Sequence, residues 1–271
     1  LPASNIASVY FSREEEIDNI QGKFRTGIMI YLDIEENNED GKYFRWEYEE
    51  TWMFRSPYPR RFDYINGAFI KLDSVREYCW KSNKSGEILI LSDLPHQEHS
   101  SKKVPITFIP SDESDRLTVR YSILIKQYSI SQKEFDFWYN LKQVSERGGN
   151  IFDTQPFPVI SNIYNTHNPE EKVLGYFEVS SVKERRIFII PEDLKELDLP
   201  RFNYSCLKYV VSPSDYIPPM SFDEIYQGFM AHGGIVFVEL IDDKLVFVQK
   251  ECSDCSVVGT ITKPEFWDDL P

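Results

Sequence analysis

Cys252 and Cys255 are the residues whose types and spacing could most directly do chemistry. A Cys-x-x-Cys pair binds zinc when a second close pair of ligands lies elsewhere in the chain. Cys79 and Cys206 are isolated, however, and no histidine lies near the pair. A thioredoxin-type redox site needs the pair at a helix N-terminus within a βαβ unit, whereas this pair follows a predicted hairpin strand. Structural disulfides are therefore the favoured interpretation for an exported chain, with at most two bridges and three connectivities open.

The four histidines are the second candidates for metal binding. His96 and His99 flank Glu98, but this spacing fits no zincin pattern and the segment resembles a polar loop. His167 lies in a loop rich in asparagine and proline, and His232 is explained as a favourable charge at the C-terminus of a helix. We therefore expect a solvated loop at His96 and His99, and neither a metal ion nor another cofactor.

Acidic residues could supply the paired carboxylates of a hydrolase, and Glu50 is in an unusual position among them. It falls in the apolar phase of a predicted strand, beside Tyr48 and Trp52. A β-bulge or a strand end explains this position, and a functional buried acid is the alternative. A glycosidase needs two carboxyl groups about 5 to 9 Å apart in a cleft, which the sequence does not define. No serine nucleophile elbow occurs, so we expect no catalytic residue.

The elements that must position these residues are mostly strands. Alternating apolar residues predict strands over 26–34 and 43–54, joined across a turn at Asp40-Gly41. The apolar phases of these two strands comprise Ile28, Ile30, Leu32 and Ile34, then Phe44, Trp46, Tyr48, Trp52 and Phe54. A further long strand is expected over 118–130 and a C-terminal hairpin over 235–249.

Two helices carry clear N-terminal signals. Ser131 with Glu134, and Ser221 with Glu224, each form the capping-box pattern. The first helix should span 131–147 and end at Gly148-Gly149. Its apolar arc covers about 200°, which predicts a helix nested in a larger body. The residues of that arc are Phe135, Trp138, Tyr139, Leu141 and Val144.

These elements predict a mainly β fold. Strands outnumber helices and do not alternate with them, which favours antiparallel sheets packed as a β-sandwich-like body. The helix 131–147 is inserted in that body, and a smaller C-terminal helix plus hairpin follows. We expect residues 1–205 to form the sandwich-like domain and residues 206–271 a C-terminal segment packed on the same body.

The composition excludes several classes of partner. A formal charge of −14 and a pI near 4.8 argue against nucleic acid and against an anionic membrane surface. No apolar run approaches the roughly 18 residues of a membrane helix. A hydrophobic content of 41% is ample for a packed core.

Several stretches together resemble the domain-of-unknown-function family 4249. They are LPASNIASVYF, KYFRWEYE, YCW, RYSILIKQYSISQKEFDFWYNLKQVSERGGNIFDTQPFPVISNI, EEKVLGYFEVSSVKERRIFI and ECSDCSVVGTITKPEFWDDLP. The resemblance extends over nearly the whole chain, and Cys252 with Cys255 matches a recurrent pair of the family. It implies an exported lipoprotein of Bacteroidetes-type bacteria, periplasmic or anchored to the outer membrane, with genes often next to TonB-dependent receptors.

The resemblance implies no established activity. Family members usually begin with a lipoprotein signal and a β-sandwich domain, so we expect this chain to be the C-terminal portion of a longer protein. Any membrane attachment would then run through an N-terminal lipid anchor absent from this chain. Our leading hypothesis is a non-enzymatic accessory protein that binds an outer-membrane receptor, another envelope protein, a glycan or a peptide. The alternative is a glycan- or peptide-active hydrolase that uses buried acids such as Glu50.

Overall fold

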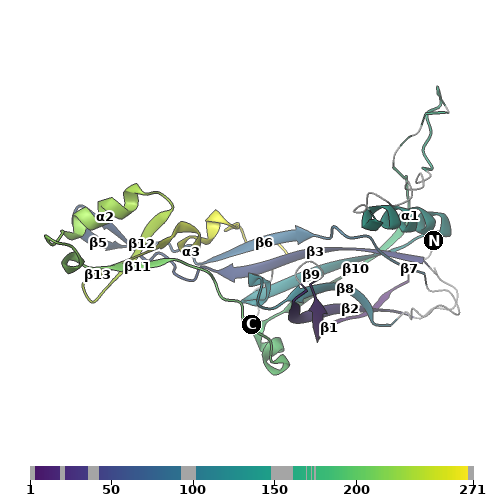
Figure 1. The fold of residues 1–271 in the computed structure, drawn as a ribbon. Helices are drawn as coiled ribbons and strands as arrows, with labels where there is room; N and C mark the ends of the chain where they lie inside the picture. Colours follow the sequence, from purple (N-terminus) through teal and green to yellow (C-terminus); the bar gives the residue numbers. More distant parts are fainter. Residues whose placement is uncertain are drawn as a thin grey trace. The chain divides into compact units, whose positions relative to one another are not determined.

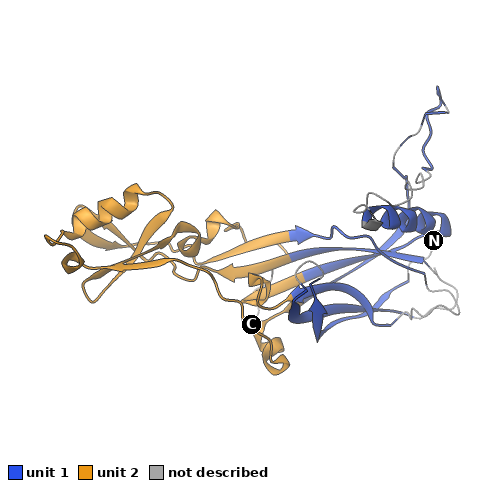
Figure 2. Cartoon of the chain, viewed as in Figure 1, with its two compact units in different colours: residues 1–50, 83–109, 123–187 blue, residues 51–82, 110–122, 188–271 orange. Residues whose placement is uncertain are grey.

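A computed structural model of the chain describes residues 4–18, 22–35, 43–92, 102–147, 161–168, 170, 171, 173 and 175–267 (Figure 1). The chain divides into two compact units (Figure 2). Unit 1 comprises residues 1–50, 83–109 and 123–187, and unit 2 comprises residues 51–82, 110–122 and 188–271. The expected division into residues 1–205 and 206–271 stays a prediction.

One antiparallel sheet has the order β1-β2-β8. Its strands are β1 (Ile6–Ile17), β2 (Phe24–Ile34) and β8 (Val104–Pro110). Gly27 of β2 lies so close to β8 that a Cβ atom there would be 2.1 Å from the carbonyl oxygen of Ile109. A side chain at this position would therefore separate the two strands.

The second sheet has the order β10-β9-β3-β6, and β7 also pairs with β3. Its strands are β3 (Tyr43–Arg55), β6 (Tyr78–Lys84), β7 (Leu89–Ser92), β9 (Arg120–Ser129) and β10 (Ser181–Ile189). The short 3-10 helix η1 (Asp115–Leu117) precedes β9. Strands β3, β6, β9 and β10 each have residues in both units.

Alternate apolar residues of the strands are buried and form the core, as the sequence predicts. The apolar phases of β2 and β3 and the matching residues of β9 are at most 9% exposed: Ile28, Ile30, Leu32, Ile34, Phe44, Trp46, Tyr48, Trp52, Phe54, Tyr121, Ile123 and Ile125. In the opposite phase, Arg45, Thr51 and Ser122 are also buried. Both faces of the sheet are therefore covered at these positions.

Helix α1 (Gln132–Arg147) connects β9 to the segment before β10. The predicted capping box is present: the Ser131 amide donates to the Glu134 carboxylate at 2.5 Å, and the Glu134 amide donates to the Ser131 hydroxyl at 3.3 Å. The helix is less deeply nested than its wide apolar arc predicts, because Phe135 and Trp138 are half-buried and Tyr139 is 48% exposed. The expected turn at residues 40 and 41 and the helix end at 148 and 149 lie outside the described residues.

Unit 2 contains a three-stranded sheet and a hairpin. The sheet has the order β11-β13-β12, with β11 (Lys208–Val211), β12 (Ile235–Ile241) and β13 (Lys244–Gln249), and the hairpin pairs β4 (Phe62–Ile65) with β5 (Ala68–Lys71). The remaining helices are η2 (Pro191–Leu197), η3 (Pro213–Asp215), α2 (Phe222–Ala231), α3 (Lys250–Ser253) and η4 (Cys255–Val257). Helix α2 has the second predicted capping box, at Ser221 and Glu224. The mainly β, antiparallel, sandwich-like fold is thus confirmed.

Candidate functional site

Two disulfides hold unit 2 together. Cys79 of β6 is bonded to Cys255, and Cys206 is bonded to Cys252, with Cα–Cα distances of 5.6 and 6.1 Å. Bridging is therefore confirmed, and the connectivity that the sequence left open is nested. The Cys-x-x-Cys residues bond to distant partners instead of to each other.

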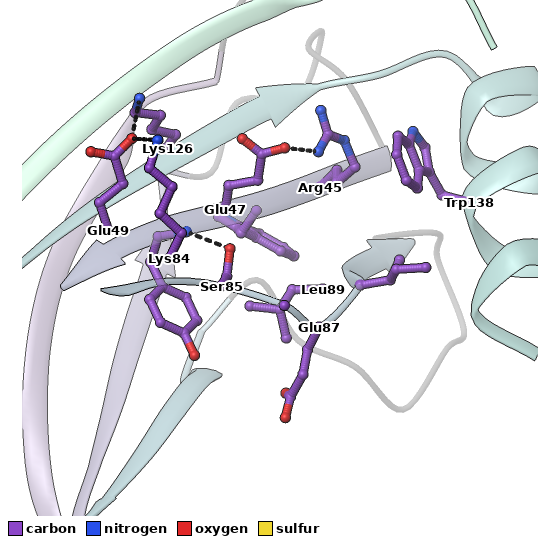
Figure 3. Close-up of a pocket in the computed structure, with 13 residues that line it drawn as sticks. Arg45, Glu47, Glu49, Lys84, Ser85, Glu87, Leu89, Lys126 and Trp138 are labelled. Carbon is purple, nitrogen blue, oxygen red and sulfur yellow. Dashed lines mark hydrogen bonds and ion pairs between the residues drawn. The ribbon is translucent and has the colours of Figure 1, made fainter. Parts of the chain in front are cut away.

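The candidate site in unit 1 is a hollow of about 360 Å³, which we call the charged hollow (Figure 3). It lies where the chain passes from β6 to β7, the two strands that pair with β3 on the side away from β9. Its lining combines charged with aromatic and aliphatic residues: Arg45, Trp46, Glu47, Tyr48, Glu49, Lys84, Ser85, Gly86, Glu87, Ile88, Leu89, Lys126 and Trp138. At the break between the strands, the Ser85 amide donates to the Tyr48 carbonyl and the Ser85 hydroxyl accepts from the Tyr48 amide.

Arg45 is the buried cation of this hollow. Its guanidinium lies between two rings, 4.3 Å from the centroid of Tyr128 and 4.6 Å from that of Trp138. It donates to the carboxylates of Glu47 and Glu178, at 2.5 Å in each case. The Trp138 indole donates to the other oxygen of Glu178 at 2.9 Å. Cation–π contacts and charge-assisted hydrogen bonds thus fix α1 and the residues before β10 against β3.

The electrostatics of this cluster agree with its hydrogen bonds. Burial, together with the hydrogen bond to Glu47, raises the pKa of Tyr128 to about 12, so its hydroxyl stays a donor. Burial alone would raise the pKa of Glu47, but hydrogen bonds from Arg45 and Tyr128 outweigh it and lower that pKa. Glu47 is therefore held as a carboxylate.

The opposite side of the charged hollow holds two lysines around one acid, as Figure 3 shows. Glu49 accepts from the ammonium of Lys126 at 3.1 Å and lies 3.6 Å from that of Lys84. The hydrogen bond from Lys126 lowers the pKa of Glu49, and the same bond raises the pKa of Lys126. The charged groups of this wall are already paired, so they suit recognition of a polar group better than proton transfer.

A larger hollow of about 870 Å³ adjoins the charged one, and we call it the edge groove. Trp46 and Leu89, which face each other in the β3–β7 register, line both hollows. The other residues of the edge groove come from β3, β7, the start of β8 and α1: Tyr43, Ile90, Leu91, Ser92, Val104, Pro105, Gln132, Phe135, Asp136, Tyr139, Lys142 and Gln143. The two hollows are therefore adjacent, one charged and one mainly apolar, and they share Trp46 and Leu89 as lining residues.

The structure does not bring the predicted site residues together here. Glu50 is buried, with 1% of its surface exposed, and it lines neither the charged hollow nor the edge groove. His96 and His99 lie outside the described residues. His167 is exposed, and His232 is the exposed C-cap residue of α2. Within the described part of the chain, no cluster of three or more histidine, cysteine, aspartate or glutamate residues could hold a metal ion.

Sequence reasoning missed Arg45, Trp138 and Glu178 as a cluster. The available signal was that Arg45 and Glu47 share one face of their strand, because side chains two positions apart point the same way. Glu178 is 133 positions from Arg45, and no period in the sequence relates the two.

The family model for "Domain of unknown function (DUF4249)" matches residues 1–186 of the 271. The chain belongs to this family. The DUF4249 match contains α1, the charged hollow and the edge groove, and it ends before Cys206, Cys252 and Cys255. The resemblance expected for the cysteine-containing C-terminal stretch therefore lies beyond the matched range. No curated protein and no solved structure shows a significant match.

The two disulfides bear on the compartment of this DUF4249 chain. Disulfides persist in oxidising compartments and are rare in the cytosol, so the two bridges indicate a site outside the cytoplasm. Across the described ranges, every helix is too short or too polar to cross a membrane.

Proposed function

We propose that this DUF4249 chain is a non-enzymatic binding protein of the cell envelope. The observation that carries the proposal is the pair of adjacent hollows, the charged hollow and the edge groove, whose apolar walls adjoin paired charges. Concave sites of this kind, apolar with a few oriented polar groups, are typical binding sites. The carboxylates of Glu47 and Glu49 accept from neighbouring cations, which supports recognition rather than acid–base chemistry.

The partner we propose is a TonB-dependent outer-membrane receptor or another envelope protein. An N-terminal lipid anchor outside this sequence would hold the protein in the periplasm or at the outer membrane. The resemblance to exported lipoproteins supports this location, and so do the two disulfides. The formal charge of −14 supports a protein partner with a cationic surface over an anionic lipid surface.

Affinity capture from envelope extract tests this function. The native lipoprotein should recover a receptor or another stable envelope partner. Tyr139→Asp places a charge in the edge groove, where Tyr139 is 48% exposed, and should abolish recovery. Tyr164→Asp is the matched control, because Tyr164 is 71% exposed and outside both hollows. Failure to recover any partner with the unmodified protein would contradict the proposal.

The alternative function is a glycan- or peptide-active hydrolase, and the observation that favours it is the burial of Glu50 in β3. Screening the purified protein on polysaccharides and peptides tests this alternative. Turnover that Glu50→Gln abolishes, with the far-UV and near-UV circular dichroism unchanged, would replace the binding proposal. Absence of turnover in both proteins would leave binding as the function.

A further inference from the structure

We propose that β7 receives an extended segment of the partner protein as an added antiparallel or parallel strand. This inference rests on the proposed function and specifies how the edge groove is filled. Its occupant would be a short strand with apolar residues and basic flanks, rather than a folded surface or a glycan.

The edge of β7 is the first observation. The strand pairs with β3 in an antiparallel register that runs from Tyr43 opposite Ser92 to Trp46 opposite Leu89. In such a pair, every second residue directs its N–H and C=O groups away from the partner strand. Among the residues that the structure describes, no backbone hydrogen bond reaches β7 from any strand or loop other than β3. An open edge of this kind is a template for another strand.

The position of the groove is the second observation. All four residues of β7 line it, from Leu89 to Ser92. Successive side chains of a strand point to opposite faces of the sheet. A hollow lined by both phases therefore opens toward the edge of the strand and not toward one face. The backbone groups that point away from β3 are thus directed into the groove.

The two walls suit an extended chain. Phe135 and Tyr139 of α1 form one wall, and their rings stack with centroids 6.0 Å apart. Val104 and Pro105 at the start of β8 form the other wall. The four residues of β7 span roughly 13 Å at strand spacing. An added strand would direct alternate side chains toward the aromatic wall and the β8 wall, which favours apolar residues in both phases.

Charge indicates the flanks of the occupant. The rim of the groove carries both signs, with Asp136 and Lys142 on α1. The chain as a whole has a formal charge of −14, so long-range attraction favours basic residues on either side of the apolar segment. A glycan would use the aromatic wall but would not need the backbone groups of β7, and this difference can be measured.

Selection of displayed random 12-residue peptides on the immobilised full chain tests the inference. Selected peptides are then synthesised with N-methyl groups on one or the other set of alternate residues. Strand addition uses the amides of one edge only. Methylation of that set should weaken binding about tenfold or more, and methylation of the other set should change it little. Equal affinity of both methylated forms and the parent would overturn strand addition, as would a selection that returns no peptide.

Two adjacent proline variants locate the edge. Ile90 and Leu91 are neighbours in β7, so one directs its N–H toward β3 and the other toward the groove. Tyr43 directs its backbone groups away from β7, because its carbonyl accepts from the Ile130 amide, so Phe44 and its partner Leu91 form a hydrogen-bonded pair. Leu91→Pro should therefore lower the melting temperature, because it removes a ladder hydrogen bond. Ile90→Pro should keep the melting temperature and weaken peptide binding. Unchanged peptide affinity in that variant would overturn the inference, and the methylated peptides test it on the unmodified chain in any case.

The outcomes separate this inference from the proposed function. Recovery of a receptor from envelope extract, together with peptides that ignore N-methylation, would leave the function standing and reject strand addition. A dimer in sedimentation experiments that the groove-facing proline variant dissociates would show that a second copy of the chain occupies β7, which also rejects a partner segment. Failure to recover any partner would reject the function itself.

Discussion

The guanidinium of Arg45 lies 4.6 Å from the centroid of the Trp138 ring, and Glu178 accepts a hydrogen bond from both side chains. A strand, a helix and the residues before β10 therefore meet at one buried cation. This contact forms the boundary of the charged hollow on the side of α1, so the stability of the site depends on it.

Replacing Arg45 by methionine should destabilise unit 1. The change removes the cation from Glu47 and Glu178 and removes both cation–π contacts, and loss of one partner of a buried ion pair is costly. We expect the free energy of unfolding in urea to fall by about 2 to 4 kcal/mol. Arg13→Met is the matched control in the exposed pair with Glu15, where a change below about 1 kcal/mol is expected. Equal effects of the two substitutions would show that the Arg45 cluster contributes no more than a surface pair.

Mass spectrometry of peptides under non-reducing conditions should find the nested bridges. The expected cross-links join Cys79 to Cys255 and Cys206 to Cys252. Their sequence separations are 176 and 46 residues, for which loop entropy gives about 5 and about 4 kcal/mol of stabilisation. The paired change Cys79→Ser with Cys255→Ser should thus lower the stability of unit 2 at least as much as the other paired change. A cross-link between Cys252 and Cys255, or free thiols in protein from an oxidising compartment, would contradict the structure.

Two glycines of unit 1 should respond in opposite ways to alanine. At Gly27 the new Cβ would lie 2.1 Å from the carbonyl oxygen of Ile109, so β2 and β8 must separate. We expect a loss of about 2 kcal/mol or more in the free energy of unfolding. At Gly86 nothing lies within 4 Å of the added atom, and alanine should be neutral or stabilise by up to about 1 kcal/mol. Thermal unfolding of both variants measures the contrast, and a tolerated Gly27→Ala would mean that β2 and β8 are less closely packed.

Asp63 should make the stability of unit 2 depend on acid pH. Burial alone would raise the pKa of Asp63, but hydrogen bonds from the Tyr64 amide and the Tyr226 hydroxyl, with the charge of Arg60, lower it below its ordinary value of 3.8. A carboxyl group with a lower pKa in the folded state stabilises the protein above the ordinary pKa, and this contribution is lost as the pH falls below it. Asp63→Asn should therefore flatten the loss of stability as the pH falls below about 3.8.

Urea titrations at several pH values measure the effect of Asp63→Asn. Asp243→Asn is the control, because Asp243 lies exposed in the turn between β12 and β13 and the change of charge is the same. A variant at Asp63 that keeps the full acid dependence of the native chain would refute the assignment.

The elements of the fold could be predicted because their causes are local. Period-two alternation over β2 and β3 needs only neighbouring residues, and each capping box needs residues three positions apart. Residues 55–75 show no strand period in the sequence, yet they contain the β4–β5 hairpin around Asn66 and Gly67. Four-residue strands are too short to show a period, and Tyr64 is buried by contacts with the distant Tyr226.

The site could not be predicted, because its causes are not local. The sequence of β3 does not show that Arg45 is buried, because the residues that cover it, Tyr128, Trp138 and Glu178, are distant in the chain. The partial burial of α1 also depends on contacts between residues that are distant in the sequence. The apolar arc of α1 is wide because Trp138 contacts Arg45 and Phe135 contacts the Tyr43 ring. It does not mean that other parts of the protein surround the helix.

The nested bridges also determine how an exported chain could mature. The four cysteines of this sequence would leave the export channel in the order 79, 206, 252 and 255, so Cys79 and Cys206 would meet an oxidant before Cys252 and Cys255. Neither is the native partner of the other. A chain that emerges from its N-terminus would therefore need either delayed oxidation or an isomerase that reshuffles an early mispaired bridge.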